Sequence, residues 1–318
     1  MGKSSKRLRC ADLTGVSIHR FLQRAPQPST CTSVPRPSKA PGYDGTKIWE
    51  EIPEWVRQLG AKLSTENPLL SKGGMLELLV PYILQAEVQR DFDFVEIFSG
   101  KAECTKSLRR AGLRGVGFDE KYSSYHNINS ITGLLNIAIA CKRVKPQGVL
   151  VMAPQCSMWL RFLDANNHKR SQNDVFGDES VPDVFEANIT ATIVAWLTEY
   201  MFYRNVWTLL EQPSDSVHGN FPSVKSVYEL LGIKRHLTYL GAFGNPLCKG
   251  TYLWTSFPSE VMECHLVRPK PEAGTKAKST YISKNGSTCG AKDLENSEAY
   301  TREFGDSISQ ALLYARSL

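Results

Sequence analysis

From residue 91 onward, short apolar runs alternate with amphipathic segments of helical length. Strands that are separated by helices favour parallel pairing, because each helix returns the chain to the same end of the sheet. We expect strands near residues 94–98, 115–118, 148–152, 206–210, 237–243 and 251–256. We expect helices near residues 103–111, 132–142, 184–203, 223–231 and 305–315. The pattern predicts an α/β fold, a Rossmann-like and mostly parallel sheet with helices on both faces.

The expected sheet also predicts where a ligand would bind. Ligands of open α/β sheets bind at the carboxyl ends of the strands, beside the point where the strand order reverses. The residues that directly follow each expected strand are therefore the ones to search for chemistry. In this chain those positions hold a glycine turn, an acidic pair, a proline–cysteine loop and a glutamate.

Length and composition divide the chain into three parts. Residues 1–45 are rich in serine, proline and basic groups and contain little apolar surface, so we expect a basic disordered tail. Residues 46–90 have apolar residues at helical spacing and then an apolar run over 75–84, so we expect a helical N-terminal extension. Residues 91–318 would form the main α/β domain, because a chain of 318 residues accommodates one α/β domain with appendages.

The positive charge of the chain is concentrated near its N-terminus. The net charge is +6, and residues 1–42 alone carry +7, so the remainder is close to neutral at −1. Attraction of a polyanion would therefore come from the tail or from a local patch. One candidate patch is residues 268–284, where five basic residues accompany a single acid, and a solvated surface loop explains it equally well.

Several features favour an intracellular protein. No apolar run is long enough to cross a bilayer, and the N-terminus lacks the apolar core of a signal peptide. The eight cysteines show no CxxC pair and no zinc-finger spacing, so we expect reduced thiols and no metal site. The basic cluster at residues 6–9 favours nuclear targeting, and the composition of the tail also fits an organellar transit peptide.

The first two expected strands end in a glycine turn and an acidic pair. Phe98, Ser99 and Gly100 open a helix, where glycine permits close approach of a ligand and free N–H groups favour its polar atoms. Asp119 and Glu120 end the second strand, where a carboxylate can accept hydrogen bonds from ribose hydroxyls. Together these features predict an adenosine-containing cofactor. The glycine turn alone is explained equally well as a tight corner, and the absence of GxGxxG disfavours a hydride-transferring enzyme.

The next two expected strands end in side chains suited to covalent catalysis. The strand near 148–152 leads into Pro154 and Cys156, which would offer a thiol at the mouth of the pocket. The strand near 206–210 leads into Glu211, and an apolar setting can raise the pKa of a glutamate enough for proton donation near neutrality. Taken singly, a packed core thiol and a loop-bracing acid explain these two residues as well.

In this order, the segments resemble the motifs of the cytosine carbon-5 DNA methyltransferases. The Phe-Ser-Gly turn resembles that family's FxG cofactor motif, and Ala-Pro-Gln-Cys at 153–156 resembles its Pro-Pro-Cys motif. Glu-Gln-Pro at 211–213 resembles Glu-Asn-Val, and residues 241–256 are similar to the strand region that carries Gln-x-Arg-x-Arg. The segment FGDSISQAL at 304–312 resembles the closing Gly-Asn-Ser-Val motif. The resemblance covers about residues 92–315.

The resemblance implies an S-adenosylmethionine-dependent methyltransferase and assigns roles to individual residues. Cys156 would be the nucleophile and Glu211 the acid. The residues implied at the cofactor are Phe98, Ser99, Gly100, Asp119, Glu120, Pro154 and Gly305. The residues expected at the substrate are Lys249, Thr251 and Arg170. DNA is the implied substrate, with RNA as the alternative.

The chain departs from the family's pattern in three ways. Gln155 replaces the second proline, Lys249 and Thr251 replace arginines, and fewer than fifty residues separate the last expected strand from the last expected helix. That short segment leaves little room for a target-recognition domain. Two alternatives therefore stay open: a methyltransferase-like binding module without chemistry, and a methyltransferase of the same fold with another acceptor. Residues 153–156 lack the Asp/Asn-Pro-Pro-aromatic motif of amino-group methyltransferases, which argues against that acceptor.

Four further residues with chemically active side chains are expected to be structural. Cys104 and Cys141 lie on expected helices, where a free cysteine packs as a small apolar side chain. Trp159 and Trp254 are expected to support the core rather than to stack on a base.

Overall fold

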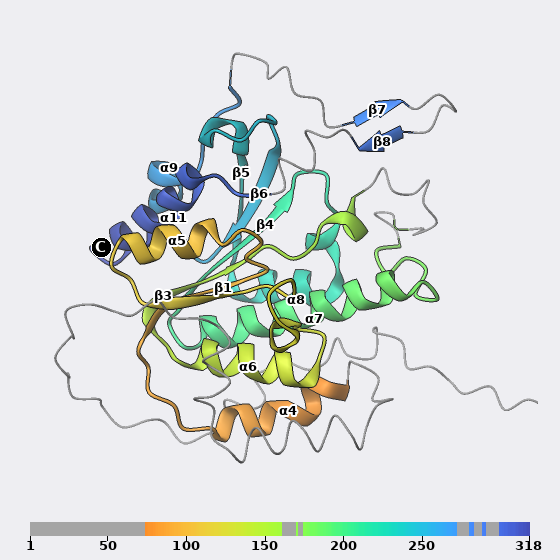
Figure 1. The fold of residues 1–318 in the computed structure, drawn as a ribbon, viewed down its shortest axis with the longest axis vertical. Coiled ribbons are helices and arrows are strands. Elements are labelled where there is room, and N and C mark those ends of the chain that lie inside the picture. Colours follow the sequence, from red (N-terminus) through yellow and green to blue (C-terminus); the bar gives the residue numbers. More distant parts are fainter. Residues whose placement is uncertain (1–73, 161–169, 171–173, 272–279, 283–287, 291–298) are drawn as a thin grey trace, which may run out of the picture.

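The computed structural model describes residues 74–160, 170, 174–271, 280–282, 288–290 and 299–318. The expected basic tail and residues 46–73 of the expected extension lie outside this part of the chain. Within it, the chain forms a six-stranded sheet with helices on both faces (Figure 1). The expected α/β class with a mostly parallel sheet is therefore confirmed.

The sheet has the strand order β2-β1-β3-β4-β6-β5. Strands β1 to β4 pair in parallel, and β6 is antiparallel to both of its neighbours, β4 and β5. The strand bounds are Phe92–Ile97 (β1), Gly115–Phe118 (β2), Val144–Met152 (β3), Trp207–Pro213 (β4), Lys234–Tyr239 (β5) and Gly250–Thr255 (β6). The order reverses beside β1, because the chain moves outward to β2 and then crosses to β3 on the opposite side. The carboxyl ends of β1 and β3 therefore flank a switch point of the kind where α/β proteins bind ligands.

The helices lie in two layers, one on each face of the sheet (Figure 1). The α6/α7 face is covered by α6 (Ile131–Lys142), α7 (Pro182–Phe202) and α8 (Pro222–Leu231), with α4 (Gly74–Gln85) packed against α6. The α5/α11 face is covered by α5 (Glu103–Arg110), α9 (Ser259–His265) and α11 (Arg302–Ala315). Short 3-10 helices are η2 (Ser124–His126), η3 (Ser157–Trp159), η5 (His218–Asn220) and η6 (Leu240–Phe243), and a separate hairpin pairs β7 (Thr280–Ile282) with β8 (Thr288–Gly290).

Local sequence explains where several helices begin and end. The Ser130 hydroxyl accepts a hydrogen bond from the Gly133 N–H at 3.0 Å and so caps the start of α6. Thr301 caps α11 in the same way, because its Oγ1 accepts from the Phe304 N–H at 3.2 Å. Gly232, with φ of 64°, ends α8 in the left-handed conformation that favours glycine.

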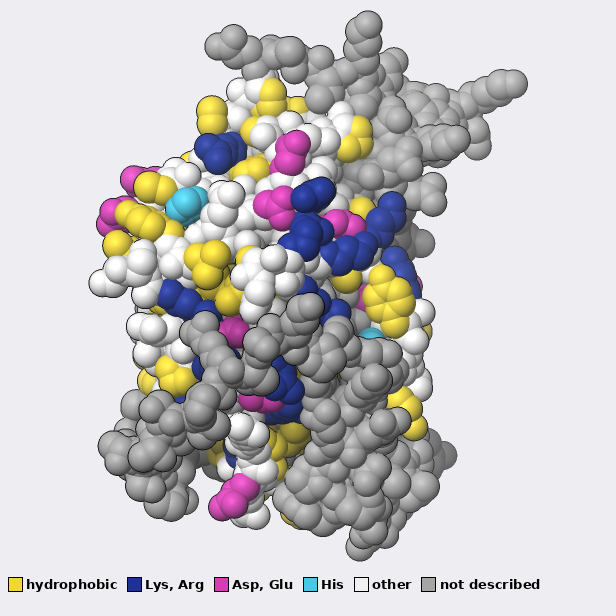
Figure 2. Space-filling model, turned by 60° about the vertical axis from the view of Figure 1, so that its left-hand side comes forward, with side chains coloured by type: hydrophobic (Ala, Val, Ile, Leu, Met, Phe, Trp, Pro, Cys, Tyr) yellow, Lys and Arg dark blue, Asp and Glu magenta, His cyan; other side chains and the backbone are white. Residues whose placement is uncertain are grey.

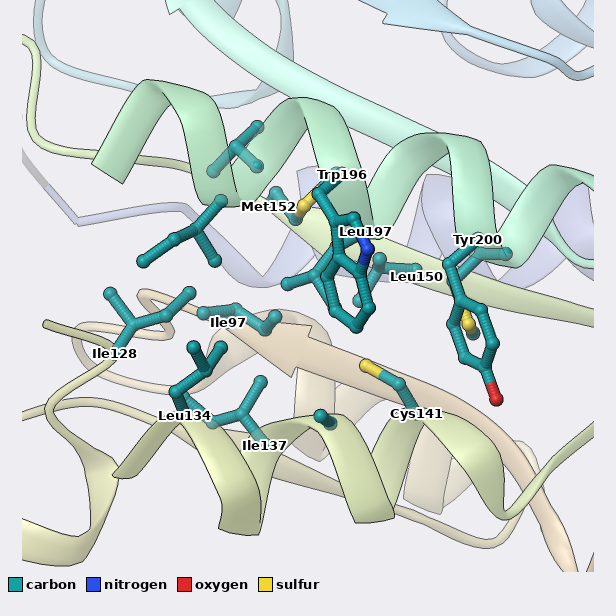
Figure 3. Close-up of a cluster of buried hydrophobic side chains, with 14 of the residues drawn as sticks. Ile97, Ile128, Leu134, Ile137, Cys141, Leu150, Met152, Trp196, Leu197 and Tyr200 are labelled. Carbon is teal, nitrogen blue, oxygen red and sulfur yellow. The ribbon is translucent and has the colours of Figure 1, made fainter. Parts of the chain in front are cut away.

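The core on the α6/α7 face is almost entirely apolar. Ile97, Leu150 and Met152 point from β1 and β3 toward Leu134 of α6 and Leu197 of α7, and all are buried (Figure 3). Successive strand residues alternate between faces, so the neighbours of these residues line the other core. The apolar run at 149–152 is continuous because a parallel strand in the middle of a sheet is covered on both sides.

The core on the α5/α11 face is smaller. Val149 and Val151 of β3 and Leu209 of β4 pack there against Leu108 of α5 and Ile308 of α11. Toward the carboxyl ends of the strands, polar groups replace the apolar side chains on this face. This polar end is where the candidate site lies.

Most expected elements are confirmed within three residues at each end, although the strand expected at 148–152 begins four residues earlier, at Val144, and two strands end elsewhere than expected. The strand expected at 237–243 ends at Tyr239, and the next four residues form η6, which closes at Gly244 with φ of 81°. Strand β4 runs past the expected residue 210 to Pro213, because antiparallel β6 pairs with it as far as Thr251. Glu211 therefore lies inside a strand rather than after one. The sequence pattern did not predict α9 or the β7–β8 hairpin.

No helix in the described part of the chain is long and apolar enough to span a membrane.

Candidate active site

The turn after β1 has an unusual backbone. Phe98, Gly100 and Ala102 have φ values of 62°, 54° and 57°, so alternate residues are left-handed. Such conformations cost non-glycine residues of order 1 kcal/mol each and concentrate at binding sites. A Cβ added to Gly100 would meet no atom within 4 Å, so the space beside the Gly100 Cα is unfilled. The Phe98 side chain packs against the core on the α6/α7 face.

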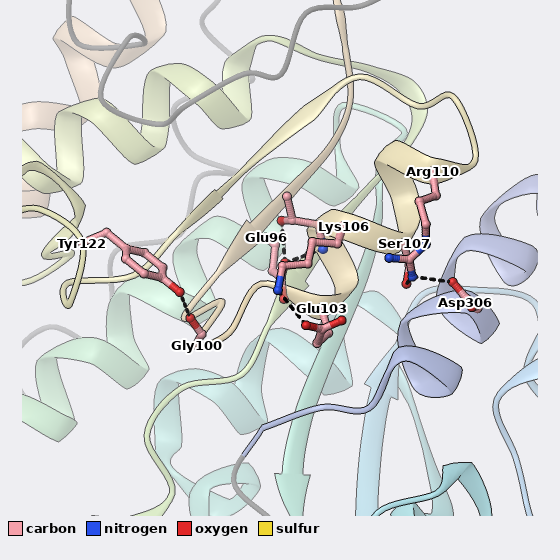
Figure 4. A network of polar contacts seen from close by, with 9 residues as sticks. Glu96, Gly100, Glu103, Lys106, Ser107, Arg110, Tyr122 and Asp306 are labelled. Atoms are coloured by element: carbon pink, nitrogen blue, oxygen red, sulfur yellow. Dashed lines mark hydrogen bonds and ion pairs between the residues drawn. The ribbon is translucent and has the colours of Figure 1, made fainter.

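Asp119 and Tyr122 from the β2–α6 connection hold this turn from both sides. Asp119 Oδ2 accepts a hydrogen bond from the Gly100 N–H at 2.8 Å. The Tyr122 hydroxyl donates to the Gly100 carbonyl, as Figure 4 shows. The expected acid and the glycine turn are thus in direct contact, and the Gly100 N–H is occupied by the carboxylate. Glu120 is exposed beside this contact.

Two side chains behind the turn are buried with unsatisfied oxygens. Ser99 Oγ is buried without a hydrogen-bond partner, and it lies 3.3 Å from the place where a Cβ of Gly117 would be. Glu96 on β1 is 1% exposed, and its Oε2 accepts from the Thr105 N–H at 2.7 Å and from the Thr105 hydroxyl at 2.5 Å. Glu96 Oε1 has no hydrogen-bond partner. Burial raises the pKa of Glu96 to about 7, although the bonds from Thr105 act in the opposite direction.

The loop after β3 presents Cys156 at partial exposure. Pro154 is buried, Gln155 is exposed and the Cys156 side chain is half-buried. The Cys156 carbonyl accepts from the Trp159 N–H at 2.8 Å, which closes the single turn of η3. The residue that interrupts the expected proline pair therefore faces solvent.

Gln212 links the cysteine loop to β4 and was not predicted from the sequence. Its side chain is fully buried, and its Nε2 donates to the Pro154 carbonyl at 2.5 Å. Ser216 donates to Gln212 Oε1 at 2.8 Å, which fixes the orientation of the amide. The sequence signal that could have identified Gln212 is its position directly after Glu211. A buried glutamine needs hydrogen-bond partners for both its amide oxygen and its amide nitrogen.

Glu211 points to the α5/α11 face. It is in register with Leu253 of β6, whose side chain belongs to the core on that face, and it is 8% exposed. Tyr300 Oη donates to Glu211 Oε2 at 2.9 Å, and Lys249 Nζ lies 3.9 Å from Oε1. The Cys156 thiol is not among these partners.

A buried polar cluster occupies this end of the α5/α11 face. Glu96 is in register with Val151, so it shares a face with Glu211. Cys104, at the start of α5, is fully buried, and its pKa is raised first by burial and then by the charges of Glu96 and Glu211. The expectation that Cys104 is a buried thiol is confirmed, and the same holds for Cys141, which is fully buried on α6.

Arg170 is a structural residue rather than part of an open loop. Its side chain is 3% exposed, donates to the Val175 and Val184 carbonyls at 2.6 and 3.0 Å, and lies 3.9 Å above the Trp159 ring. Its expected contact with substrate stays a prediction, and in this structure the guanidinium is buried. Trp159 also packs against His218, whose pKa burial lowers to about 3. The expected structural role of Trp159 is confirmed, and Trp254 is likewise buried.

The two residues expected at the phosphate-facing strand differ in access. Lys249 is partly exposed beside Glu211. Thr251 is fully buried, its Oγ1 lies 3.4 Å from the Lys249 carbonyl, and its side chain offers no surface to a polynucleotide. We therefore retain Lys249 as a candidate and drop Thr251.

Gly305 lies where α11 crosses α5. A Cβ there would come within 2.6 Å of Ser107 Oγ and 2.7 Å of the Glu103 carbonyl oxygen, so glycine permits the close approach of the two helices. This packing explains the glycine without a ligand. Its expected role at a cofactor stays a prediction.

Charges of both signs lie side by side on the surface. Arg110 lies 2.9 Å from Asp306, and Lys106 lies 2.7 Å from Glu103. Figure 2 shows Lys and Arg side chains next to Asp and Glu side chains on the face that it presents. Among the described residues, no group of three or more His, Cys, Asp or Glu side chains could hold a metal ion.

No protein-family model matches this chain, and no curated protein matches it.

Proposed function

We propose that the chain is an S-adenosylmethionine-dependent methyltransferase of Rossmann-like fold that methylates carbon 5 of cytosine, with DNA as the first substrate to test and RNA as the second. The observation that carries the proposal is the 2.5 Å hydrogen bond from Gln212 to the Pro154 carbonyl. It joins the loop of Cys156 to the strand of Glu211, the two motifs that the reaction needs together.

The residues at the end of β1 and β2 fit an adenosine-containing methyl donor. The space beside the Gly100 Cα is unfilled, and Ser99 supplies a buried hydroxyl without a partner. Each oxygen of the Asp119 carboxylate can accept more than one hydrogen bond, so Asp119 can bind ribose hydroxyls while it holds the turn. When bound, S-adenosylmethionine supplies an electrophilic methyl group.

Cys156 would act as the nucleophile. Carbon 5 of cytosine is too weakly nucleophilic to accept a methyl group unaided, and addition of a thiolate to carbon 6 converts the ring into an enamine. A base within a duplex must first leave the stack to reach the thiol. The half-buried position of Cys156, after a buried proline held by Gln212, restricts its orientation.

Glu211 would assist the addition. A carboxyl group that donates a proton to the ring nitrogen removes the negative charge that builds up as the thiolate adds to carbon 6. Once carbon 5 carries the methyl group, loss of its proton to water, departure of the thiolate and return of the ring-nitrogen proton to the Glu211 carboxylate would restore the aromatic ring.

The test is transfer of a labelled methyl group from S-adenosylmethionine to cytosine-containing DNA and RNA. Cys156→Ala should abolish transfer, and Glu211→Gln should lower kcat by about 10²-fold or more. Cys248→Ala is the matched control, because Cys248 is also a half-buried free cysteine and should be dispensable. A Cys156→Ala protein that transfers methyl groups at the wild-type rate contradicts the proposal.

A second candidate function is a binding module that keeps the cofactor site and has lost the chemistry. The burial of Thr251 and Arg170 favours it, because both are withdrawn from any polynucleotide. This candidate predicts that the protein binds S-adenosylmethionine, as measured by calorimetry, and transfers no methyl group to either nucleic acid.

The proposed place of action is the nucleus, where DNA is available. The basic residues of the N-terminal tail support this proposal. Imaging of the full chain and of a variant with residues 6–9 replaced by alanine would distinguish nuclear from organellar targeting.

A further inference from the structure

The Glu211 carboxylate has two neighbours that hold its oxygens differently. The Tyr300 hydroxyl donates to Oε2 at 2.9 Å, whereas the Lys249 ammonium lies 3.9 Å from Oε1, beyond hydrogen-bonding distance. Glu211 Oε1 is buried and has no hydrogen-bond partner among the described residues. Within that part of the chain, one oxygen of the carboxylate is therefore fixed by a hydrogen bond and the other is not.

Tyr300 is itself fixed by the start of α11. Its ring centroid lies 4.8 Å from that of Phe304, which packs against Phe243 at 5.2 Å. Thr301 Oγ1 accepts from the Phe304 N–H at 3.2 Å and donates to the Phe243 carbonyl at 2.5 Å. Because these contacts hold the start of α11 against η6, they also hold the Tyr300 hydroxyl in place beside Glu211.

The electrostatic surroundings keep the phenol a donor. Burial raises the pKa of Tyr300 well above its ordinary value, and the charge of Glu211 raises it further. The Cys104 thiol on α5 and the Glu96 carboxyl on β1 also raise the pKa of Tyr300 through their charges. Lys249 places a positive charge beside Glu211. Tyr300 is therefore protonated across the neutral pH range and donates to the carboxylate rather than accepting from it.

We propose that Tyr300 is the positioning residue of Glu211, whose hydroxyl fixes Oε2 so that Oε1 is presented to the ring nitrogen of the substrate base. This assignment rests on the proposed function. A carboxylate without this bond is free to rotate toward the Lys249 ammonium and to present either oxygen, so fewer encounters have the geometry for proton transfer.

The decisive variant is Tyr300→Phe, which keeps the ring and its contact with Phe304 and removes only the hydroxyl. The matched control is Tyr314→Phe on the same helix, whose hydroxyl donates to Glu260 Oε1 at 2.7 Å on the surface. Two measurements are made on the full chain. One is the carbon-13 NMR chemical shift of labelled glutamate carboxyls at a fixed pH, in which Glu211→Gln identifies the Glu211 signal. The other is the measurement of kcat and KM for methyl transfer to a cytosine-containing oligonucleotide.

Removal of the hydroxyl leaves Glu211 Oε2 without its hydrogen bond, so the carbon-13 signal of the Glu211 carboxyl should move in Tyr300→Phe. The kcat should fall about tenfold while KM changes less than about twofold. Tyr314→Phe should leave the Glu211 signal, kcat and KM unchanged.

An unchanged Glu211 carboxyl signal in Tyr300→Phe overturns the inference even where methyl transfer is robust, because the hydroxyl then does not hold the carboxylate. A moved signal with wild-type kcat also overturns it, because the fixed oxygen is then not needed. A wild-type protein that transfers no methyl group to DNA or RNA contradicts the proposed function instead. In that case the positioning role falls with it, while the carboxyl signal still reports whether the hydrogen bond forms.

Discussion

Helices cover the same strands on both faces of the sheet, but the side chains that are buried near the carboxyl ends of the strands differ between the two faces. On the α6/α7 face, Ile97 and Met152 continue the apolar core to the ends of β1 and β3. On β4, Leu210 is followed on this face by the neutral, buried amide of Gln212. On the α5/α11 face, Glu96 and Glu211 occupy the corresponding ends of β1 and β4. Both carboxylates are more than nine-tenths buried.

This difference predicts how the stability of each face responds to side-chain volume and to pH. Apolar burial contributes to stability at every pH, whereas a buried carboxylate costs free energy whenever it is ionised. Burial lowers the pKa of His218, which packs on the α6/α7 side, to about 3, whereas the unfolded chain protonates it near 6.5, so its contribution to stability is lost as the pH falls below 6.5. We therefore expect the α6/α7 face to be sensitive to side-chain volume and, through His218, to acid, and the α5/α11 face to be sensitive to a rise in pH.

The largest stability effect is expected from a cavity on the α6/α7 face. Leu150→Ala removes a fully buried side chain from the central strand β3, and we expect the free energy of unfolding to fall by about 4 kcal/mol. The loss should be the same at pH 5 and pH 8 in urea unfolding. Leu230→Ala, at an exposed position of α8, is the control and should cost less than about 1 kcal/mol. A strongly pH-dependent loss in Leu150→Ala would break the contrast between the faces.

The next largest effect is a pH dependence that arises from Glu96. Its pKa is about 7 in the folded chain and 4.5 in the unfolded one, so between these values the folded state holds a proton that the unfolded state releases. The contribution to stability is present below pH 4.5 and is lost as the pH rises through 7, by up to about 3 kcal/mol. Glu96→Gln should remove this loss, so the free energy of unfolding of the variant relative to wild type should rise between pH 5 and pH 8.

The control for Glu96 is Glu103→Gln, which removes a glutamate that pairs with Lys106 on the surface of α5. It should keep the wild-type difference between pH 5 and pH 8 in urea unfolding. If Glu96→Gln also keeps that difference, the carboxylate is not the source of the pH dependence.

The smallest of these effects concerns the packing of α11 on α5. Gly305→Ala places a Cβ within 2.7 Å of the Glu103 carbonyl oxygen, where backbone must shift. The strain of about 1–3 kcal/mol exceeds the helix-propensity gain of about 1 kcal/mol, so we expect a net loss of about 1 kcal/mol. Gln310→Ala, an exposed position on the same helix, should be neutral or slightly stabilising in thermal unfolding. A stabilised Gly305→Ala protein would show that the two helices do not meet as closely as described.

The sequence predicted the elements well because each has a local signature. The apolar run before Pro154 marks β3, and Gly232 marks the end of α8. The placement of Gly100 and Asp119 at one edge of the sheet also followed from the rule that parallel strands end at one edge, whereas the hydrogen bond between them was not predicted.

What the sequence could not predict depends on contacts between distant residues. Arg170 resembles a loop residue in sequence, and only the fold stacks it on Trp159. Glu211 became a strand residue because antiparallel β6 pairs beyond the end of β3. Tyr300 is 89 residues from Glu211, so no local pattern joins the phenol to the carboxylate.

The central claim is that Cys156 forms a covalent bond to carbon 6 of cytosine. The most direct measurement is mass spectrometry of the full chain after incubation with S-adenosylmethionine and an oligonucleotide that contains 5-fluorocytosine. Fluorine cannot leave carbon 5 as a proton does, so the adduct should accumulate, with the peptide that contains Cys156 carrying the oligonucleotide. Cys248→Ala should form the same adduct, and Cys156→Ala should form none. An adduct that persists in Cys156→Ala, or cofactor binding without any adduct in wild type, would contradict the account.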